Sequence, residues 1–486
     1  MARCGLGGAG LVLVPFLLAA CTPSALAPQA EQTQAKPADS QPTASELDEH
    51  QRILAAYGGA YSDPRLQAKV EQLVDRLVAA SDRADLHYKV TILDSPTVNA
   101  FALPGGALYV TRGLLALAND ESELASVIGH EIGHVIARHA ELREQEIRDE
   151  QLGDRVFTDL VNDRQAGALA LARSKLKLAG FSQKQELQAD AIGIGITAHA
   201  GLDPYGAARF LASLQRDSEL RRRAAGAGKR AAPDFLASHP TTPERIAEAL
   251  ATARQYKAPA TDTPDERARA RGAYLADLDG VLYGEDQSQG FVDGRRFTQP
   301  RLGLTFTAPE GFLLDNSAQA VLGVTRHGNA ALSFDVVSVP AEQALADYLT
   351  SGWLEIEPKS VEPLTINGFA AATAQAKDDN WNFRLYVIRF GSDVYRFIFA
   401  TKKPSAEADR LFRQSVDTFR RMTLAEIRQV KSLHVRVVTV KPGDTVQKLA
   451  GRMALPDRRL ERFLVLNGLD AGNELQPGSE VKIVAE

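Results

Sequence analysis

Apolar residues recur at helical spacing through the part of the chain before residue 256. Those between residues 66 and 79 fall on one face of a helix: Leu66, Val70, Leu73, Val74 and Leu77. This repeat predicts an amphipathic helix, and a second helical pattern covers about 121–140. Residues 87–93 alternate as a strand, and two short strand-like runs flank the turn at Gly105-Gly106. This part of the chain is therefore predicted to be mainly helical with a short β region.

The pattern changes near residue 288, where strand-like runs follow one another up to an amphipathic helix around 406–420. In the last fifty residues, two strand-like runs flank two short helical runs. A chain of 486 residues exceeds the size of one hydrophobic core. We therefore predict a multidomain α+β protein with four parts: a mainly helical domain over 46–256, a linker with a helix over 257–287, an α+β domain over 288–421 and a small βααβ domain over 435–486.

The N-terminus has the pattern of a bacterial lipoprotein signal peptide. Arg3 precedes a short apolar run that ends in Leu18-Ala19-Ala20-Cys21, which is too short for a transmembrane helix. We predict that residues 1–20 are removed and that Cys21 carries a lipid that tethers the protein to a membrane. Cleavage after Ala27 is the alternative, which Pro28 disfavours.

Residues 21–45 are rich in Ala, Pro, Gln and Thr, which predicts a disordered tether. Thr22 after the lipidated cysteine favours the outer membrane, so the expected location is the periplasm-facing side of the cell envelope. Cys4 and Cys21 are the two cysteines, so the mature protein is expected to have no disulfide. The net charge of −5 provides no electrostatic basis for binding nucleic acid.

The helical pattern over 121–140 contains His130-Glu131-Ile132-Gly133-His134. Residues four apart project from one face of a helix, so both imidazoles can bind one metal ion. Glu131 is placed to take a proton from a metal-bound water as general base. A chance match is the alternative, but apolar residues on both sides predict a buried helix and favour the metal site.

A catalytic zinc needs a third protein ligand. Ala137 and Ala140 stand where a metzincin-type site needs Gly and His, so that class is rejected. Glu186, on a later predicted helix, fits the gluzincin arrangement and is predicted to be the third ligand; a solvated helix charge is the alternative. Asp190 is one helical turn further along, where it can accept a hydrogen bond from a ligand imidazole.

Four segments together resemble the HtpX and CAAX-prenyl-protease type of zinc metallopeptidase, and most closely its soluble periplasmic branch (BepA/LoiP-like). They are HEIGHVIARHA from residue 130, ELQAD from residue 186, AGLDP from residue 200, and Ser238-His239-Pro240 followed by Arg245. The resemblance covers about residues 46–256. It implies a gluzincin-type domain with one Zn²⁺ per chain and these site residues: His130, His134 and Glu186 as ligands, Glu131 as general base and Asp190 as outer carboxylate.

The resemblance also implies a substrate strand and a possible inhibitory residue. Asn99, Ala100 and Phe101 match the edge strand that pairs with an extended substrate backbone. His239 is predicted to fill the open zinc position in a latent state or to help orient substrate; a plain loop histidine is the alternative. His139 is predicted to be a structural residue at the helix end.

Two positions depart from the family pattern. Gln183 and Gln188 stand where Arg and Glu are common. Neither position is a ligand, so the departures are expected to alter local ion pairing and not the metal site.

The last segment, 435–486, resembles a LysM module, which implies binding to peptidoglycan. Possible glycan-binding residues lie at its two turns: Gly443, Asp444, Thr445 and Asn467. Met453 replaces a frequent aromatic residue, and a spacing or protein-interaction role is the alternative. The domain over 288–421 faintly resembles PsbP-like folds and contains no catalytic constellation.

Together these features predict a zinc endopeptidase of the bacterial envelope that degrades misfolded or misassembled periplasmic and outer-membrane proteins. The predicted partners are protein substrates, peptidoglycan and a membrane. The alternative is a chaperone-like or peptidoglycan-binding scaffold whose protease site is normally latent. Peptidoglycan hydrolysis is a third possibility, which the peptidase motif disfavours.

Overall fold

The structure is a computed structural model that describes residues 44–143, 181–225, 235, 239–257, 263–316, 320–325, 328–353, 356–470 and 472–486. The predicted signal peptide, Cys21 and residues 21–43 of the predicted tether lie outside the described residues. The first described helix, α1 (Ala44–Tyr57), includes residues 44 and 45, which were predicted as the end of that tether. Within the described ranges, no helix is long and apolar enough to cross a membrane.

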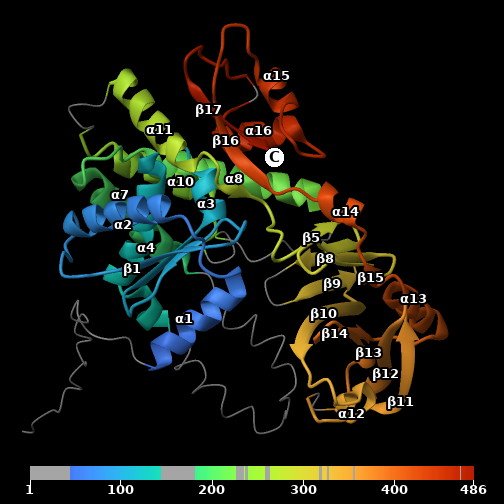
Figure 1. The fold of residues 1–486 in the computed structure, drawn as a ribbon. Coiled ribbons are helices and arrows are strands. Elements are labelled where there is room, and N and C mark those ends of the chain that lie inside the picture. The colour runs from blue at the N-terminus through green and yellow to red at the C-terminus, as the bar shows by residue number, and fades with distance from the viewer. Residues whose placement is uncertain are drawn as a thin grey trace, which may run out of the picture. The chain divides into compact units, whose positions relative to one another are not determined.

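The first domain places helices around a small sheet (Figure 1). Its strands are β1 (Lys89–Leu93), β2 (Ala100–Ala102) and β3 (Ala107–Thr111), in the order β1-β3-β2, so that β2 lies at an edge. β1 pairs with β3 in parallel, and β2 pairs with β3 antiparallel. The helices after α1 are α2 (Pro64–Ala79), α3 (Arg112–Leu117), α4 (Glu121–Ile136), α7 (Gln183–His199), α8 (Gly206–Ala225) and α10 (Pro243–Ala253).

Side-chain caps explain where the helices that build the site begin. Asp120, Ser182 and Thr242 precede α4, α7 and α10, and each side chain accepts a hydrogen bond from a backbone N–H of the first turn. The helix predicted over 121–140 ends earlier, at Ile136. Arg138 has a φ of 55°, a left-handed conformation that stops the helix and redirects the chain at His139.

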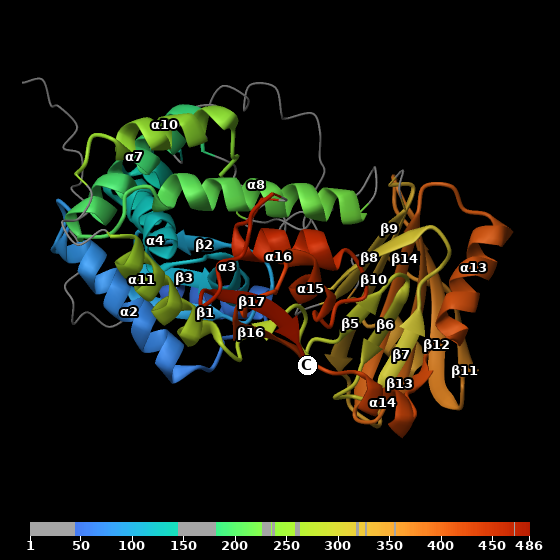
Figure 2. The same ribbon diagram turned by 90° about the horizontal axis from the view of Figure 1, so that it is seen from above.

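Helices α4 and α7 pack closely because small residues meet along their contact (Figure 2). A Cβ atom on Gly129 would lie 2.9 Å from the carbonyl oxygen of Gly193, and one on Gly133 would lie 2.9 Å from that of Ala189. Any larger residue would force the helices apart. This approach brings the motif of α4 against Glu186 and Asp190 on α7.

The region assigned to an α+β domain contains two sheets. The larger has the strand order β11-β12-β13-β14-β10-β9-β8, and the smaller has the order β15-β7-β6-β5. Its strands and helices are β5 (Phe291–Asp293), β6 (Arg296–Gln299), β7 (Leu304–Thr307), β8 (Phe312–Asn316), β9 (Val321–Thr325), β10 (Ala330–Ser338), α12 (Leu345–Leu349), β11 (Lys359–Ile366), β12 (Phe369–Lys377), β13 (Asn382–Phe390), β14 (Asp393–Thr401), α13 (Ala406–Asp417) and β15 (Arg420–Arg421). One cluster of buried side chains includes Phe306, Phe334 and Phe397, so these aromatic residues form a core.

The C-terminal domain has the predicted order of two strands flanking two helices: β16 (Leu433–Thr439), α15 (Val446–Gly451), α16 (Arg459–Asn467) and β17 (Glu480–Ala485). The linker supplies helix α11 (Pro264–Leu278) and strand β4 (Leu282–Tyr283), which pairs with β16. Helix α14 (Leu424–Gln429) precedes β16. Met453 is buried in the core of this domain.

Lys482 of β17 ties the C-terminal domain to the first one. Its side chain is fully buried, and its Nζ donates to the carbonyl oxygens of Ala116 and Ala118, each at 2.7 Å. These carbonyls lie at the C-terminal end of α3, where a donor group satisfies oxygens that lack a helical partner. Val435 and Val465 also belong to the hydrophobic cluster of the first domain. The two domains therefore share buried contacts.

Candidate metal centre

Four buried residues bring metal-binding atoms together: His130, His134, Glu186 and His239. One nitrogen or oxygen from each lies within 4.8 Å of the others. The first two come from α4, the third from α7, and His239 from the segment just before α10. The structure thus assembles all three predicted ligands and adds His239, the residue predicted as fourth ligand or plug.

The spacing within α4 places the two imidazoles side by side. The Nε2 atoms of His130 and His134 are 2.9 Å apart. Glu186 faces both: its Oε1 is 3.5 Å from Nε2 of His134, and its Oε2 is 3.6 Å from Nε2 of His130. The three donors therefore converge on one point between the two helices.

Asp190 holds His130 in the orientation that a ligand needs. Nδ1 of His130 lies 2.8 Å from Oδ1 of Asp190, so Nδ1 carries the proton and Nε2 is left with a lone pair toward the cluster. Burial by itself would raise the pKa of Asp190, but the hydrogen bonds and charges of His130 and Arg245 outweigh it and lower that pKa to about 2. Asp190 is therefore ionised at neutral pH.

Arg245, to which the sequence assigned no role, is almost fully buried behind the ligands. Its Nε donates to Oδ2 of Asp190 and its Nη2 to Oδ1, both at 2.8 Å. Its Nη1 lies 2.7 Å from Oε2 of Glu186. One guanidinium thus neutralises two buried carboxylates, which a lysine with its single charged atom could not do as well.

His139 lies against the second ligand and was predicted only as a structural residue. It is buried, its Nδ1 is 2.9 Å from Nδ1 of His134, and its Nε2 is 3.3 Å from Oε1 of Gln188. Gln188 thus positions His139, and His139 positions His134. The left-handed turn at Arg138 brings the ring there, and helical spacing alone could not have indicated it.

Glu131 lies beside the donors but is not among the four. Its side chain is buried, and no hydrogen-bond partner of its Oε1 exists within the described ranges. Burial raises its pKa, and the charges of His239 and His130, together with a backbone hydrogen bond with Ala102, oppose that rise without cancelling it. A carboxylate that is buried next to a metal-sized space and has a raised pKa is suited to accept a proton.

Asn99, Ala100 and Phe101 lie where the edge strand was expected. Ala100 and Phe101 belong to β2, at the edge of the sheet, and Ala102 contacts Glu131. The Asn99 side chain donates to the hydroxyl of Tyr57 at 2.9 Å, and the Phe101 ring stacks on Tyr109. The strand is thus held firmly from one side.

The donor set fits a divalent cation. The Nε2 atoms of His130 and His134 face each other at 2.9 Å, and two nitrogens this close repel each other unless a positive charge, a proton or a metal cation, lies between them. The pKa of His134 is lowered to about 3, first by burial and then by the charge of His130, so this ring is a neutral ligand at pH 7. Hydrogen bonds to His134 and His239 hold the pKa of Glu186 well below its usual range against the effect of burial. Nitrogen and oxygen donors of this kind are those that zinc binds in catalytic sites.

Comparisons with known proteins agree with this geometry. Residues 64–253 match the sequence profile of peptidase family M48, and residues 438–484 match that of the LysM domain. The segment 64–253 is thus similar to the peptidase domains of family M48, and it is called the M48 domain below. The resemblance inferred from the motifs, to a metallopeptidase with a C-terminal LysM domain, is thereby confirmed.

The matched relatives are metallopeptidases. The chain is 30% identical over 252 residues to the beta-barrel assembly-enhancing protease of Yersinia pestis, covering 50% of this chain and 49% of that protein. It is 36% identical over 172 residues to the mitochondrial metalloendopeptidase OMA1 of Arabidopsis thaliana, covering 34% and 32%. The chain thus spans about half the length of the first of these relatives.

A solved structure, cyanobacterial PsbP (CyanoP) from Synechocystis sp. PCC 6803, matches 28% of this chain and 98% of its own. It does so with 14% identity and a TM-score of 0.23. A likeness at this level carries no conclusion about the domain over 288–421.

The side chains proposed to bind glycan have roles within the LysM domain. Gly443 has a φ of 82° at the first turn, and Asp444 accepts from the backbone N–H of Lys441. Thr445 caps α15. Asn467 is buried, with its side chain donating to the carbonyl oxygen of Lys482 at 2.8 Å and accepting from the N–H of the same residue at 2.7 Å. These contacts account for the residue types structurally, and the glycan-binding role stays a prediction.

Replacing Arg245 by Met is expected to destabilise the metal-free M48 domain by about 3–5 kcal/mol, because it leaves the carboxylates of Asp190 and Glu186 buried without a cation. Urea unfolding of the metal-free protein, monitored by far-ultraviolet circular dichroism, measures this loss. Arg254→Met, on the exposed end of the same helix, is the matched control and should change stability by less than about 0.5 kcal/mol. Equal effects of the two substitutions would contradict the assignment.

Proposed function

We propose that this protein is a zinc endopeptidase of the bacterial cell envelope that cleaves misfolded or misassembled periplasmic and outer-membrane proteins. The observation that carries the peptidase is the convergence of His130, His134 and Glu186, with Glu131 beside them. The test is cleavage of casein by the purified protein next to its Glu131→Gln variant. The substrate class rests on similarity to relatives such as the beta-barrel assembly-enhancing protease.

A bound zinc would lower the pKa of a water molecule and polarise the peptide carbonyl. The protein's own residues do the rest. Glu131 accepts the proton of the attacking water at its unpartnered Oε1 and can return it to the leaving amine. Asp190 and Arg245 hold the ligands rigidly, so that the geometry does not have to be assembled during the reaction.

The edge of β2 is the proposed substrate-binding strand. Among the described strands β2 pairs with β3 alone, which leaves its other backbone edge as the place where we propose that an extended peptide adds. Since Ala102 at the end of β2 contacts Glu131, a strand added there would run past the catalytic carboxylate. Backbone pairing reads no side chains, which suits a protease that acts on many unfolded segments.

We further propose that His239 keeps the enzyme latent. Its Nδ1 lies 3.0 Å from Oε1 of Glu186 and 3.2 Å from Nε2 of His130, so it occupies the fourth donor position that a water or substrate needs. The ring of Phe235 stacks on it at 4.4 Å between centroids. The backbone N–H of Phe235 in turn donates to the carbonyl oxygen of Val98 at 3.0 Å, next to the substrate strand.

His239→Ala is expected to weaken zinc binding by about tenfold, because one of four donors is lost, and to raise basal casein cleavage at saturating zinc by a similar factor, because the fourth position opens. A chelator competition titration and a cleavage assay measure the two effects. His199→Ala is the control: this histidine of α7 meets the ring of Tyr256 edge to face and is not part of the four-residue cluster. The plug is refuted if zinc affinity and basal cleavage both stay unchanged.

The envelope location rests on two attachments that we propose from the sequence: a lipid on Cys21 and the LysM domain on peptidoglycan. The second should show as retention of the purified protein on insoluble peptidoglycan in a pull-down. A variant truncated after residue 432 is not a fair control, since Lys482 and Val465 are packed into the M48 domain. Competition by soluble chitin oligosaccharides is the better one, and no retention would remove the wall-binding role.

A second candidate is a chaperone-like scaffold whose protease is silent. The filled fourth position at His239 favours it. Full rescue of a deletion phenotype by Glu131→Gln would support the scaffold, whereas no rescue would support the enzyme.

A further inference from the structure

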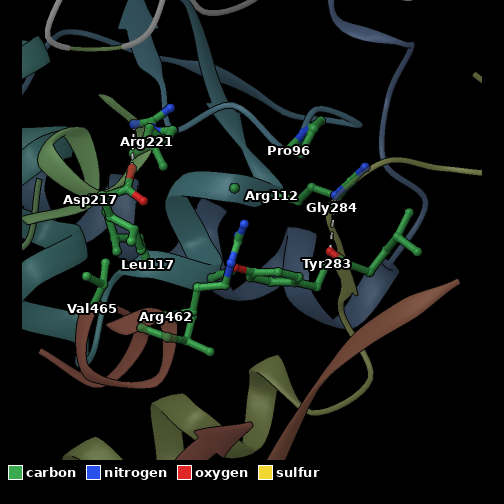
Figure 3. Close-up of a pocket in the computed structure, with 15 residues that line it drawn as sticks. Pro96, Arg112, Leu117, Asp217, Arg221, Tyr283, Gly284, Arg462 and Val465 are labelled. Atoms are coloured by element: carbon green, nitrogen blue, oxygen red, sulfur yellow. Dashed lines mark hydrogen bonds and ion pairs between the residues drawn. The ribbon is translucent and has the colours of Figure 1, made fainter. Parts of the chain in front are cut away.

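A cavity of about 220 Å³ lies away from the metal centre, where α3, α8, α16 and the chain around β4 meet (Figure 3). Its walls are mostly apolar, and they include Val98, Leu117, Leu220, Leu282, Val465 and Leu466. Three arginines also line it, one each from α3, α8 and α16: Arg112, Arg221 and Arg462. One acid, Asp217, lies in the same wall.

Arg112 has a buried donor atom that a ligand in the cavity could satisfy. Its side chain is fully buried. Its Nε donates to Oδ1 of Asp94 at 2.5 Å and its Nη1 to the carbonyl oxygen of Leu282 at 3.2 Å, but Nη2 has no partner among the residues that the structure describes. A buried cationic donor without an acceptor is costly, so an acceptor in this cavity would remove a penalty that the fold otherwise carries.

The other two arginines add positive charge without closing the cavity. Arg462 donates from Nη2 to Oδ1 of Asp457 at 3.1 Å and also hydrogen-bonds the Tyr283 hydroxyl, while its Nε has no hydrogen-bond partner within the described part of the chain. Arg221 forms an ion pair with Asp217. Figure 3 shows the labelled side chains of Arg112, Arg221 and Arg462 arranged around the cavity, with Tyr283 below it.

The charged groups and the apolar walls of the cavity together limit the chemical class of ligand that it can bind. Each guanidinium has an aspartate partner, Asp94 for Arg112, Asp217 for Arg221 and Asp457 for Arg462. The case for an anion therefore rests on the donors that have no hydrogen-bond partner among the described residues, Nη2 of Arg112 and Nε of Arg462, and guanidinium N–H groups pair best with a planar carboxylate. Asp217 disfavours a dianion such as phosphate, which the apolar walls would also leave poorly solvated. The volume of the cavity is large enough for a ligand with a few carbon atoms and too small for a drug-sized molecule.

We propose that this cavity binds a small carboxylate with an apolar side group, such as a short-chain carboxylic acid or the C-terminal residue of a peptide. The carboxylate accepts from Nη2 of Arg112 and from Arg462, and the apolar group contacts the leucine and valine walls. Because Arg112 belongs to the M48 domain and Arg462 to the LysM domain, the ligand bridges the two and stabilises their contact.

The test is isothermal titration calorimetry of the full-length protein with N-acetyl-L-leucine and with hexanoate. We expect at least one of them to bind. Two control compounds should each bind at least about tenfold more weakly. N-acetyl-L-leucinamide keeps the apolar side chain but has no negative charge, and inorganic phosphate has negative charge but no apolar group. Tighter binding of N-acetyl-L-leucine identifies a peptide C-terminus, and tighter binding of hexanoate identifies a free acid.

Arg462→Gln should weaken the bound carboxylate by at least about tenfold, since it removes a charged donor at the half-exposed rim of the cavity without burying a new charge. Arg452→Gln, an exposed arginine of the same domain that does not line the cavity, should leave affinity unchanged. Arg112→Gln should abolish binding if that variant folds. Binding of neither carboxylate, equal binding of the amide, or equal effects of Arg462→Gln and Arg452→Gln overturns the proposal, whatever the outcome of the protease assays.

Discussion

Replacing Glu131 by Gln is expected to lower kcat/KM for casein-derived peptides by about 10³-fold, within the range of about 10²–10⁴ that a general base contributes. Gln has nearly the same shape as Glu but cannot accept a proton from water. Glu131 is outside the set of four donor atoms, so zinc content should stay the same as in the wild type. Folding stability should change little, since the buried oxygen that is replaced has no hydrogen-bond partner among the described residues and only a 3.6 Å contact with Nε2 of His239.

The measurement is cleavage of a fluorogenic peptide together with metal analysis of the same preparation. Glu121→Gln is the matched control, because Glu121 lies on the same helix but at its surface, 3.7 Å from Arg76. If the Glu131→Gln variant kept more than about a tenth of wild-type activity at full zinc content, Glu131 would not be the general base.

Replacing Glu186 by Ala is expected to weaken zinc binding by more than about a hundredfold, because even the loss of a residue that only orients a ligand costs about 10- to 100-fold. The substitution removes the one carboxylate of the four-residue cluster. It also leaves Nη1 of Arg245 without the oxygen that lies 2.7 Å away, so a repulsive cation replaces a ligand. Proteolysis should fall with the zinc.

Metal content after dialysis and competition with a chromophoric chelator measure this loss, and a circular dichroism spectrum distinguishes it from unfolding. Glu248→Ala, an exposed glutamate of α10, is the control and should retain one zinc per chain. Retention of one tightly bound zinc in the Glu186→Ala protein would show that the third ligand is another residue, with His239 the first to examine.

The two substitutions distinguish the role of the catalytic base from the role of the metal ligands. Glu131→Gln leaves the metal and removes the chemistry, whereas Glu186→Ala removes the metal and leaves the base in place. An enzyme whose site is latent because of His239 loses activity in both cases. If the protein acts instead as a scaffold, Glu131→Gln should change neither its contacts with partners nor its function in the cell.

The chemical part of the site could be predicted from local spacing. His130 and His134 share one face of a helix because 3.6 residues make a turn, and Glu186 and Asp190 share one face of another for the same reason. The small residues at 129, 133 and 193 then allow those two helices to touch. Patterns within one helix thus carried the ligands, the base and the outer carboxylate.

The helix boundary and its consequence could not be predicted in the same way. Apolar spacing extended the helix to about 140, but the chain turns at Arg138 with a positive φ. That turn buries His139 against His134 and brings Gln188 behind it. A left-handed residue other than Gly leaves no periodic signal, since its cost is met by contacts made elsewhere in the fold.

The sequence by itself predicted a pair of histidines able to bind a metal with a glutamate between them, a third candidate ligand in Glu186, and the order of the predicted domains. Only the tertiary structure showed that His239 lies within reach of the three other donors, that Arg245 contacts two carboxylates at once, and that Arg112 and Arg462 line one cavity. The reason is physical. Contacts within a helix follow from a fixed repeat, whereas contacts between residues more than 50 positions apart depend on how separate elements pack, and no short pattern encodes that distance.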